Sequence, residues 1–169
     1  DADPEVVHYT ASTLNYLEER YEKAIQKARA LCVEELTRER LMNVATLYSK
    51  YMGSGLLEGD ILPIYRNSYI EVLELIKKEF GVDAEIVKLL IEAYVSDGQL
   101  EKADALVVKA VELFPDNLEL KFVRMKFYNT VGRLEDIVGV AEEILAMPDE
   151  LTGEQQAMID FWLSEDAGR

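Results

Sequence analysis

The feature that most constrains this chain is a block of about 34 residues that occurs twice. In the first copy, apolar residues recur at helical spacing on both sides of a glycine: Val87, Leu90, Ile91 and Tyr94 before Gly98, and Leu100, Ala103, Val107 and Ala110 after it. A shift of 34 residues takes Tyr94 to Tyr128 and Gly98 to Gly132. The pattern predicts a hairpin of two helices joined by a tight turn, and it predicts that this hairpin occurs twice.

This unit resembles the tetratricopeptide repeat (TPR). The family favours Leu at position 7 of its unit, Tyr at 11, Ala at 20 and 27 and Pro at 32. With Ala84 as position 1, these residues are Leu90, Tyr94, Ala103, Ala110 and Pro115. The second copy matches less closely, because Lys121 and Ile137 depart from the pattern.

The resemblance implies an all-α fold, a right-handed αα-solenoid of TPR-like helix hairpins in one domain of residues 1–169. We expect repeat units over 5–36, 37–83, 84–117 and 118–150, followed by a capping helix over 153–164. The first unit would hold helices over about 5–17 and 21–31. Thr37 suits a helix N-cap, and a later helix should begin near Asp60 with Pro63 in its first turn. Thr152 and Gln155 have the spacing of a capping box.

Charge narrows the choice of partners. The chain carries 33 acidic and 18 basic residues, a formal net charge of −15. Such a field repels nucleic acids and anionic membranes, so we expect neither as a partner. No apolar run is long enough to span a bilayer, and we expect no direct membrane insertion. A protein or peptide segment with basic patches would suit this surface, although the acidity can also serve solubility alone.

No constellation of reactive residues is apparent. Cys32 is the single cysteine and His8 the single histidine, and the chain has no glycine-rich phosphate-binding motif. Adjacent acids such as Glu142 and Glu143 diverge by about 100° on a helix and do not converge for acid–base work. We therefore predict no catalytic, cofactor-binding or metal site, and a protein that is not an enzyme.

The TPR resemblance also indicates which residues would face a partner. Family positions 2, 5, 9 and 12 line the concave wall. They are Glu85, Lys88, Glu92 and Val95 in the first copy, Glu119, Phe122, Lys126 and Asn129 in the second, and Met42, Ala45, Ser49 and Met52 in an earlier unit. The side chains expected to contact a partner are Glu85, Lys88, Glu92, Phe122, Lys126, Asn129 and Ser49.

A second candidate surface lies in the least repeat-like stretch. Tyr65 and Tyr69 are one helical turn apart with Arg66 between them, and exposed aromatic residues beside Arg are common in binding hot spots. The alternative is that both tyrosines pack against the neighbouring helices.

We therefore expect a scaffold or adaptor that holds a segment of another protein. The alternative is the soluble TPR domain of a larger bacterial membrane-associated assembly, in secretion or exopolysaccharide biosynthesis. Its catalytic or membrane parts would lie outside this chain, which begins at Asp1 rather than Met. We expect the cytoplasm, or the periplasm if a leader or membrane helix was removed. The sequence leaves open whether the chain forms a homo-oligomer.

Overall fold

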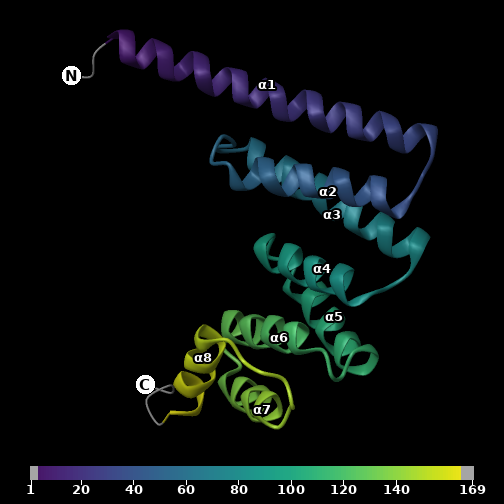
Figure 1. Cartoon of the computed structure of the whole chain (residues 1–169), viewed down its shortest axis with the longest axis vertical. Helices are drawn as coiled ribbons and strands as arrows, with labels where there is room; N and C mark the ends of the chain where they lie inside the picture. The colour runs from purple at the N-terminus through teal and green to yellow at the C-terminus, as the bar shows by residue number, and fades with distance from the viewer. Residues whose placement is uncertain (1–3, 165–169) are drawn as a thin grey trace. The chain divides into compact units, whose positions relative to one another are not determined.

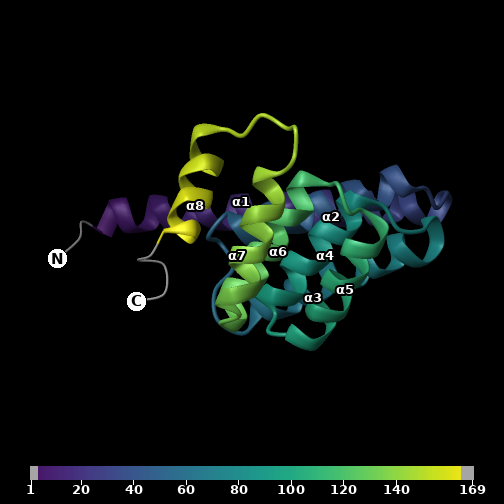
Figure 2. The same cartoon turned by 90° about the horizontal axis from the view of Figure 1, so that it is seen from below.

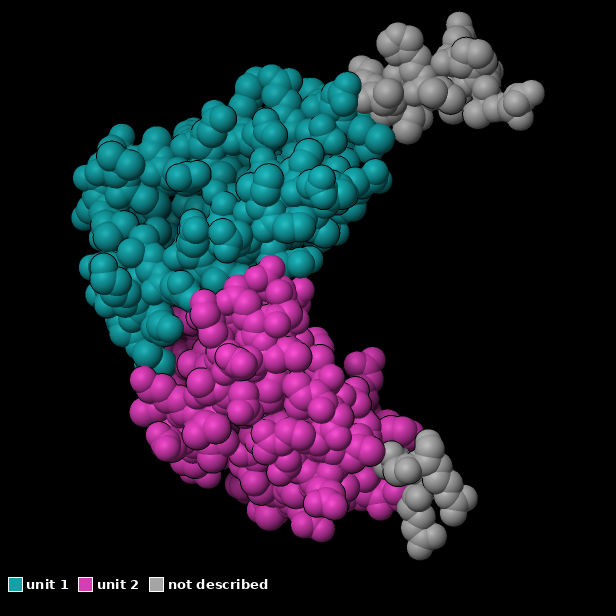
Figure 3. Space-filling view, turned by 180° about the vertical axis from the view of Figure 1, so that it is seen from behind, with its two compact units in different colours: residues 1–82 teal, residues 83–169 magenta. Residues whose placement is uncertain are grey.

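The computed structural model describes the backbone of residues 4–164 and the side chains of residues 13–164, so the side chain of His8 lies outside the described part. Within residues 4–164 the chain forms eight helices and no strand, which confirms the all-α class (Figure 1). The helices are α1 (Pro4–Glu34), α2 (Arg38–Gly53), α3 (Ile61–Phe80), α4 (Ala84–Ser96), α5 (Leu100–Leu113), α6 (Leu118–Val131), α7 (Leu134–Leu145) and α8 (Gly153–Leu163). They form two compact units, Asp1–Val82 and Asp83–Arg169 (Figure 3).

In the first unit, α2 is the central helix and packs against both α1 and α3. It buries Leu41, Val44 and Tyr48, which recur at the spacing of one helical face. The helix begins as expected at Thr37, whose hydroxyl accepts a hydrogen bond from the Arg40 amide at 3.2 Å. The apolar spacing of α2 therefore places it between its two neighbours.

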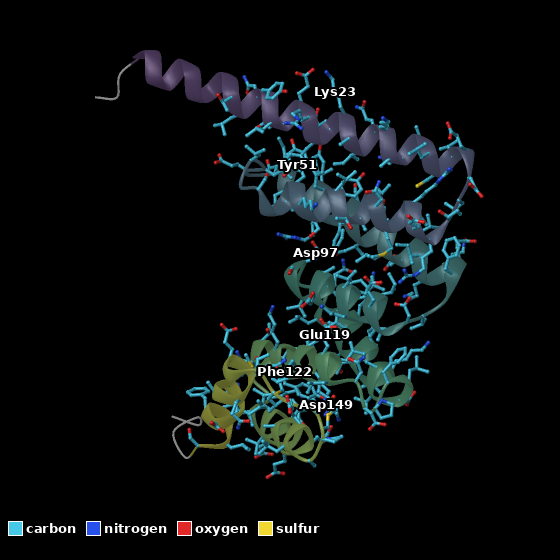
Figure 4. All side chains as sticks on the ribbon, viewed as in Figure 1. Lys23, Tyr51, Asp97, Glu119, Phe122 and Asp149 are labelled. Atoms are coloured by element: carbon cyan, nitrogen blue, oxygen red, sulfur yellow. The ribbon has the colours of Figure 1, made fainter. Side chains whose placement is uncertain are left out.

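The helices of the first unit differ from prediction at one point. We expected α1 to be two helices, over about 5–17 and 21–31, and this was wrong: α1 is continuous from Pro4 to Glu34. The reason is local, since Glu18-Glu19-Arg20 are good helix formers with no glycine or proline among them. Tyr21 also stacks on Tyr51 of α2 at 4.8 Å between ring centroids, beyond the expected break (Tyr51 is labelled in Figure 4).

The expected helix near Asp60 is confirmed as α3. It begins at Ile61, holds Pro63 in its first turn and ends at Phe80, before Gly81 with φ 88°. Proline is tolerated there because the first-turn amides have no partner within the helix.

In the second unit, the same backbone hydrogen bonds recur after 34 residues. The Gln99 amide donates to the Tyr94 carbonyl at 2.9 Å, and the Arg133 amide donates to the Tyr128 carbonyl at 2.9 Å. Each bond closes a turn at a glycine with positive φ, 74° at Gly98 and 75° at Gly132. The left-handed conformation that glycine adopts without steric cost thus reverses the chain at both places.

The helices that open the two copies begin alike. The Asp83 side chain accepts from the Ile86 amide and the Asn117 side chain from the Leu120 amide, both at 2.9 Å. The two residues are again 34 positions apart, so equivalent caps start α4 and α6.

The core of the second unit follows from this pairing. The α4 helix packs against α5 and α6, α6 against α7, and α7 against α8 (Figure 2). One buried cluster joins α6, α7 and α8: Met125, Ile137, Val140, Ala141, Ile144 and Ile159. The predicted capping box at the start of α8 is confirmed, because Thr152 and Gln155 each accept a hydrogen bond from the other's backbone amide, at 3.2 and 2.8 Å.

Two glycines of the second unit should respond oppositely to substitution. Gly132→Ala places a Cβ on a residue with φ 75°, and we expect the free energy of unfolding to fall by about 1–2 kcal/mol. Gly139 lies inside α7, and a Cβ there would meet no atom within 4 Å, so Gly139→Ala should raise it by about 0.5–1 kcal/mol. Urea unfolding of both variants measures the difference, and equal effects would contradict it.

Candidate functional site

The second unit carries a groove of about 360 Å³ between α4, α6 and α8, here called the α6 groove. It is lined by Lys88, Glu92, Glu119, Phe122, Val123, Met125, Lys126, Asn129, Met158 and Trp162. Five of the side chains expected to face a partner therefore lie together on one surface. Glu85 is exposed but does not line the groove, and Ser49 is an exposed residue of α2 in the other unit.

The apolar part of the α6 groove is held by the core beneath it. Phe122 and Trp162 are half-buried and pack against the cluster shared by α6, α7 and α8. Val123 and Met125 are buried, whereas Met158 is 47% exposed. The groove thus has a preformed aromatic and aliphatic surface on which another apolar side chain can be desolvated.

Charged and polar side chains border this apolar surface. Lys88 of α4 forms a hydrogen-bonded ion pair with Glu119 of α6, and this bond raises the pKa of the Lys88 ammonium (Figure 4 shows Glu119 and Phe122 on α6). Lys126 and Asn129 lie one turn apart on α6 and are exposed. The arrangement of an apolar centre with a polar border is typical of protein-binding sites.

The α8 side of the groove was not expected. Met158 and Trp162 are one turn apart on α8, a helix that the sequence led us to expect only as a cap. The available signal was that this helix holds the only tryptophan, a residue type enriched in binding hot spots.

Glu143 of α7 was considered from the sequence only as one of two adjacent acids, without a structural role. Its carboxylate oxygen accepts from Lys121 Nζ and from Arg124 Nη2, both at 2.6 Å. Arg124 is only 8% exposed, so the ion pair neutralises a nearly buried charge and fastens α6, the central helix of the groove, to α7. The departure of Lys121 from the TPR pattern at an apolar position was the available signal.

The predicted surface at Tyr65, Arg66 and Tyr69 is not an exposed tyrosine pair. Tyr69 is 9% exposed, and Tyr65 is half-buried with its ring edge-on to Tyr51 at 5.0 Å between centroids. Arg66 is half-buried. Both tyrosines therefore pack against neighbouring helices, as the alternative expected, because Tyr69 is buried and Tyr65 lies against Tyr51 of α2.

The α6 groove is lined by two lysines, two glutamates, one asparagine and five apolar residues. Its lining holds no histidine, cysteine, serine or threonine. Over the residues that the structure describes, no three or more histidine, cysteine, aspartate or glutamate side chains come together in a way that could bind a metal ion. Among the same residues, no helix is both long and apolar enough to cross a bilayer.

Glu143→Gln should loosen the attachment of α6. Burial alone would raise the pKa of Glu143, but the hydrogen bonds from Lys121 and Arg124 outweigh it and hold the pKa below its usual 4.5. The carboxylate therefore stabilises the fold above the unfolded-state pKa, and this contribution is lost as the pH falls through the lower folded-state pKa. Because Glu143 is 47% exposed, we expect a modest loss of about 1–2 kcal/mol at pH 7.

Denaturant unfolding at pH 7 and below pH 4 measures this loss, and the difference from the wild type should shrink at the lower pH. Glu142→Gln removes the same charge from an exposed neighbour and is the matched control. An equal loss in both variants would contradict the assignment.

The chain was also compared with known proteins. No protein-family model, curated protein or solved structure matches it.

Proposed function

We propose that this chain is a TPR-like interaction domain that binds a segment of another protein in the α6 groove. The observation that carries the proposal is the meeting of Lys88, Glu92, Phe122, Lys126 and Asn129, chosen from the repeat pattern, at one groove with an aromatic surface. A preformed surface of this kind limits the entropy lost on binding. The groove therefore suits a short segment that carries one large apolar side chain and polar neighbours.

The finer architecture belongs to the same proposal. A right-handed αα-solenoid is supported by the turn and cap hydrogen bonds that recur after 34 residues, at Gly98 and Gly132 and at Asp83 and Asn117. It is also supported by α6, which packs against both helices of the preceding hairpin, α4 and α5. In such an array each hairpin buries its apolar faces on its neighbours and leaves one wall uncovered.

The test compares proteins that co-purify with the wild-type chain and with two groove variants. Phe122→Ala removes part of the apolar surface, and Lys126→Glu reverses the charge at the border. We expect each to weaken binding of the same partner at least tenfold, about 1.4 kcal/mol, measured by calorimetry once the partner is identified by mass spectrometry.

Matched controls come from α5, outside the groove. Val108 is 55% exposed and Lys109 is also exposed, so Val108→Ala and Lys109→Glu make comparable changes there. Circular dichroism should show that all four variants are folded. Unchanged binding by both groove variants, or equal losses in the controls, would reject the α6 groove as the binding site.

A further inference from the structure

A second concave surface lies in the first unit, far from the α6 groove in sequence. Both α1 and α3 pack on α2, but they make no close backbone contact with each other. Two cavities of about 380 and 320 Å³ follow one another between them and share Arg29, Tyr48 and Ser68. They adjoin at these three residues with α2 beneath them, and together they are here called the α1–α3 trench.

The length and the helical walls of the trench suit a helix. Its walls run from Glu22 to Val33 on α1 and from Ile64 to Leu75 on α3, about 16 Å or three helical turns on each side. The walls are helices with their own backbone hydrogen bonds, so they offer no strand edge to an extended segment. An occupant of an apolar depression must satisfy its own backbone, which a helix does.

The two halves of the trench differ in chemistry. On the C-terminal side of Arg29 along α1, the lining of the trench is largely apolar. It includes Val33, which is 88% exposed, together with Val72 and Leu75. Toward the other end the lining is polar and includes Glu22, Gln26 and Tyr65. An occupant should therefore carry its apolar side chains on one side of a polar residue near its middle.

The charges of the trench identify that polar residue. Three charged side chains line it: Glu22, Glu71 and Arg29. Glu22 accepts from the Tyr65 hydroxyl and Glu71 from the Asn67 amide, each at 3.4 Å. Arg29 Nη1 donates to the neutral hydroxyl of Tyr48 at 3.4 Å, and no ion pair to Arg29 is formed among the described residues. Of these three charged side chains only Arg29 lines both cavities, so its guanidinium is the charge at the centre of the trench that a partner carboxylate can complement.

We propose that the α1–α3 trench binds an amphipathic helix of a partner protein, with one Asp or Glu paired to Arg29 and apolar residues three to seven positions away against Val33, Val72 and Leu75. The site is independent of the α6 groove. The net charge of −15 does not prevent this contact, because repulsion at physiological salt is screened beyond about 8 Å.

The test selects a library of helix-constrained 15-residue peptides, with charged and apolar positions randomised, against the full chain. We expect enriched peptides to carry a carboxylate one turn from an apolar pair. Arg29→Glu should weaken their binding at least tenfold, and changing the peptide carboxylate to lysine should restore binding to that variant. Lys27→Glu, an equal charge change on an exposed α1 residue that does not line the trench, should leave binding unchanged.

Cys32 provides a second readout, because this single thiol lines the apolar half and is half-buried. Bound peptide should slow its alkylation by iodoacetamide in the wild type. Peptides without a preference for a carboxylate, or binding lost in Phe122→Ala but kept in Arg29→Glu, would overturn the proposal. So would a wild-type dimer in sedimentation that Val33→Glu dissociates, since a second copy would then occupy the trench.

Discussion

Every helix that the structure describes packs against at least one neighbour, because none can cover its own apolar residues alone. The α2 helix buries Tyr48 and Tyr51 only because α1 and α3 lie against it. Ile159 of α8 is fully buried by a cluster that α6 and α7 supply. Burial of such stripes is the main favourable term in helical stability, since short isolated helices are marginal in water.

This dependence explains why concave surfaces form beside packed helices. When two helices pack on a third without close backbone contact between them, the third becomes the floor of a depression. The α1–α3 trench forms in this way. In the α6 groove, Phe122 and Trp162 are supported from below by core residues and remain accessible from above. In both surfaces, side chains needed for the fold also form the floor for a ligand, so stability and recognition are not separable there.

The sequence was most informative where a single residue determines the local conformation of the backbone. Glycine at 98 and 132 acts within a few residues, so these two glycines and the apolar spacing on either side of them predicted α4 to α7. The side-chain caps at 83 and 117 were seen only in the structure. The same reasoning failed for α1, where a break between the two helices of one repeat unit was expected from the family pattern but no residue interrupts the helix. The pattern of a family that a chain resembles is weaker evidence for the end of a helix than a residue that breaks the helix.

The candidate site was predictable in part for the same reason. Helical spacing brought Phe122, Lys126 and Asn129 together, because residues three and four apart share a face. Spacing within one helix could not show that Tyr69 is covered or that Trp162 forms a wall, since both depend on packing between helices distant in sequence. Glu143 was missed likewise, because its bonds to Lys121 and Arg124 join two helices.

Trp162 has a spectroscopic consequence. It is the only tryptophan in the chain, and it lies half-buried in the α6 groove with Phe161 edge-on at 5.1 Å between ring centroids. Indole emission shifts with the polarity around the ring, so the emission of the unlabelled protein, excited where its nine tyrosines do not absorb, reports on one site. A molecule that displaces water from that ring would shift the emission to shorter wavelength. Separation of α8 from its neighbours would expose the ring to water and shift the emission to longer wavelength.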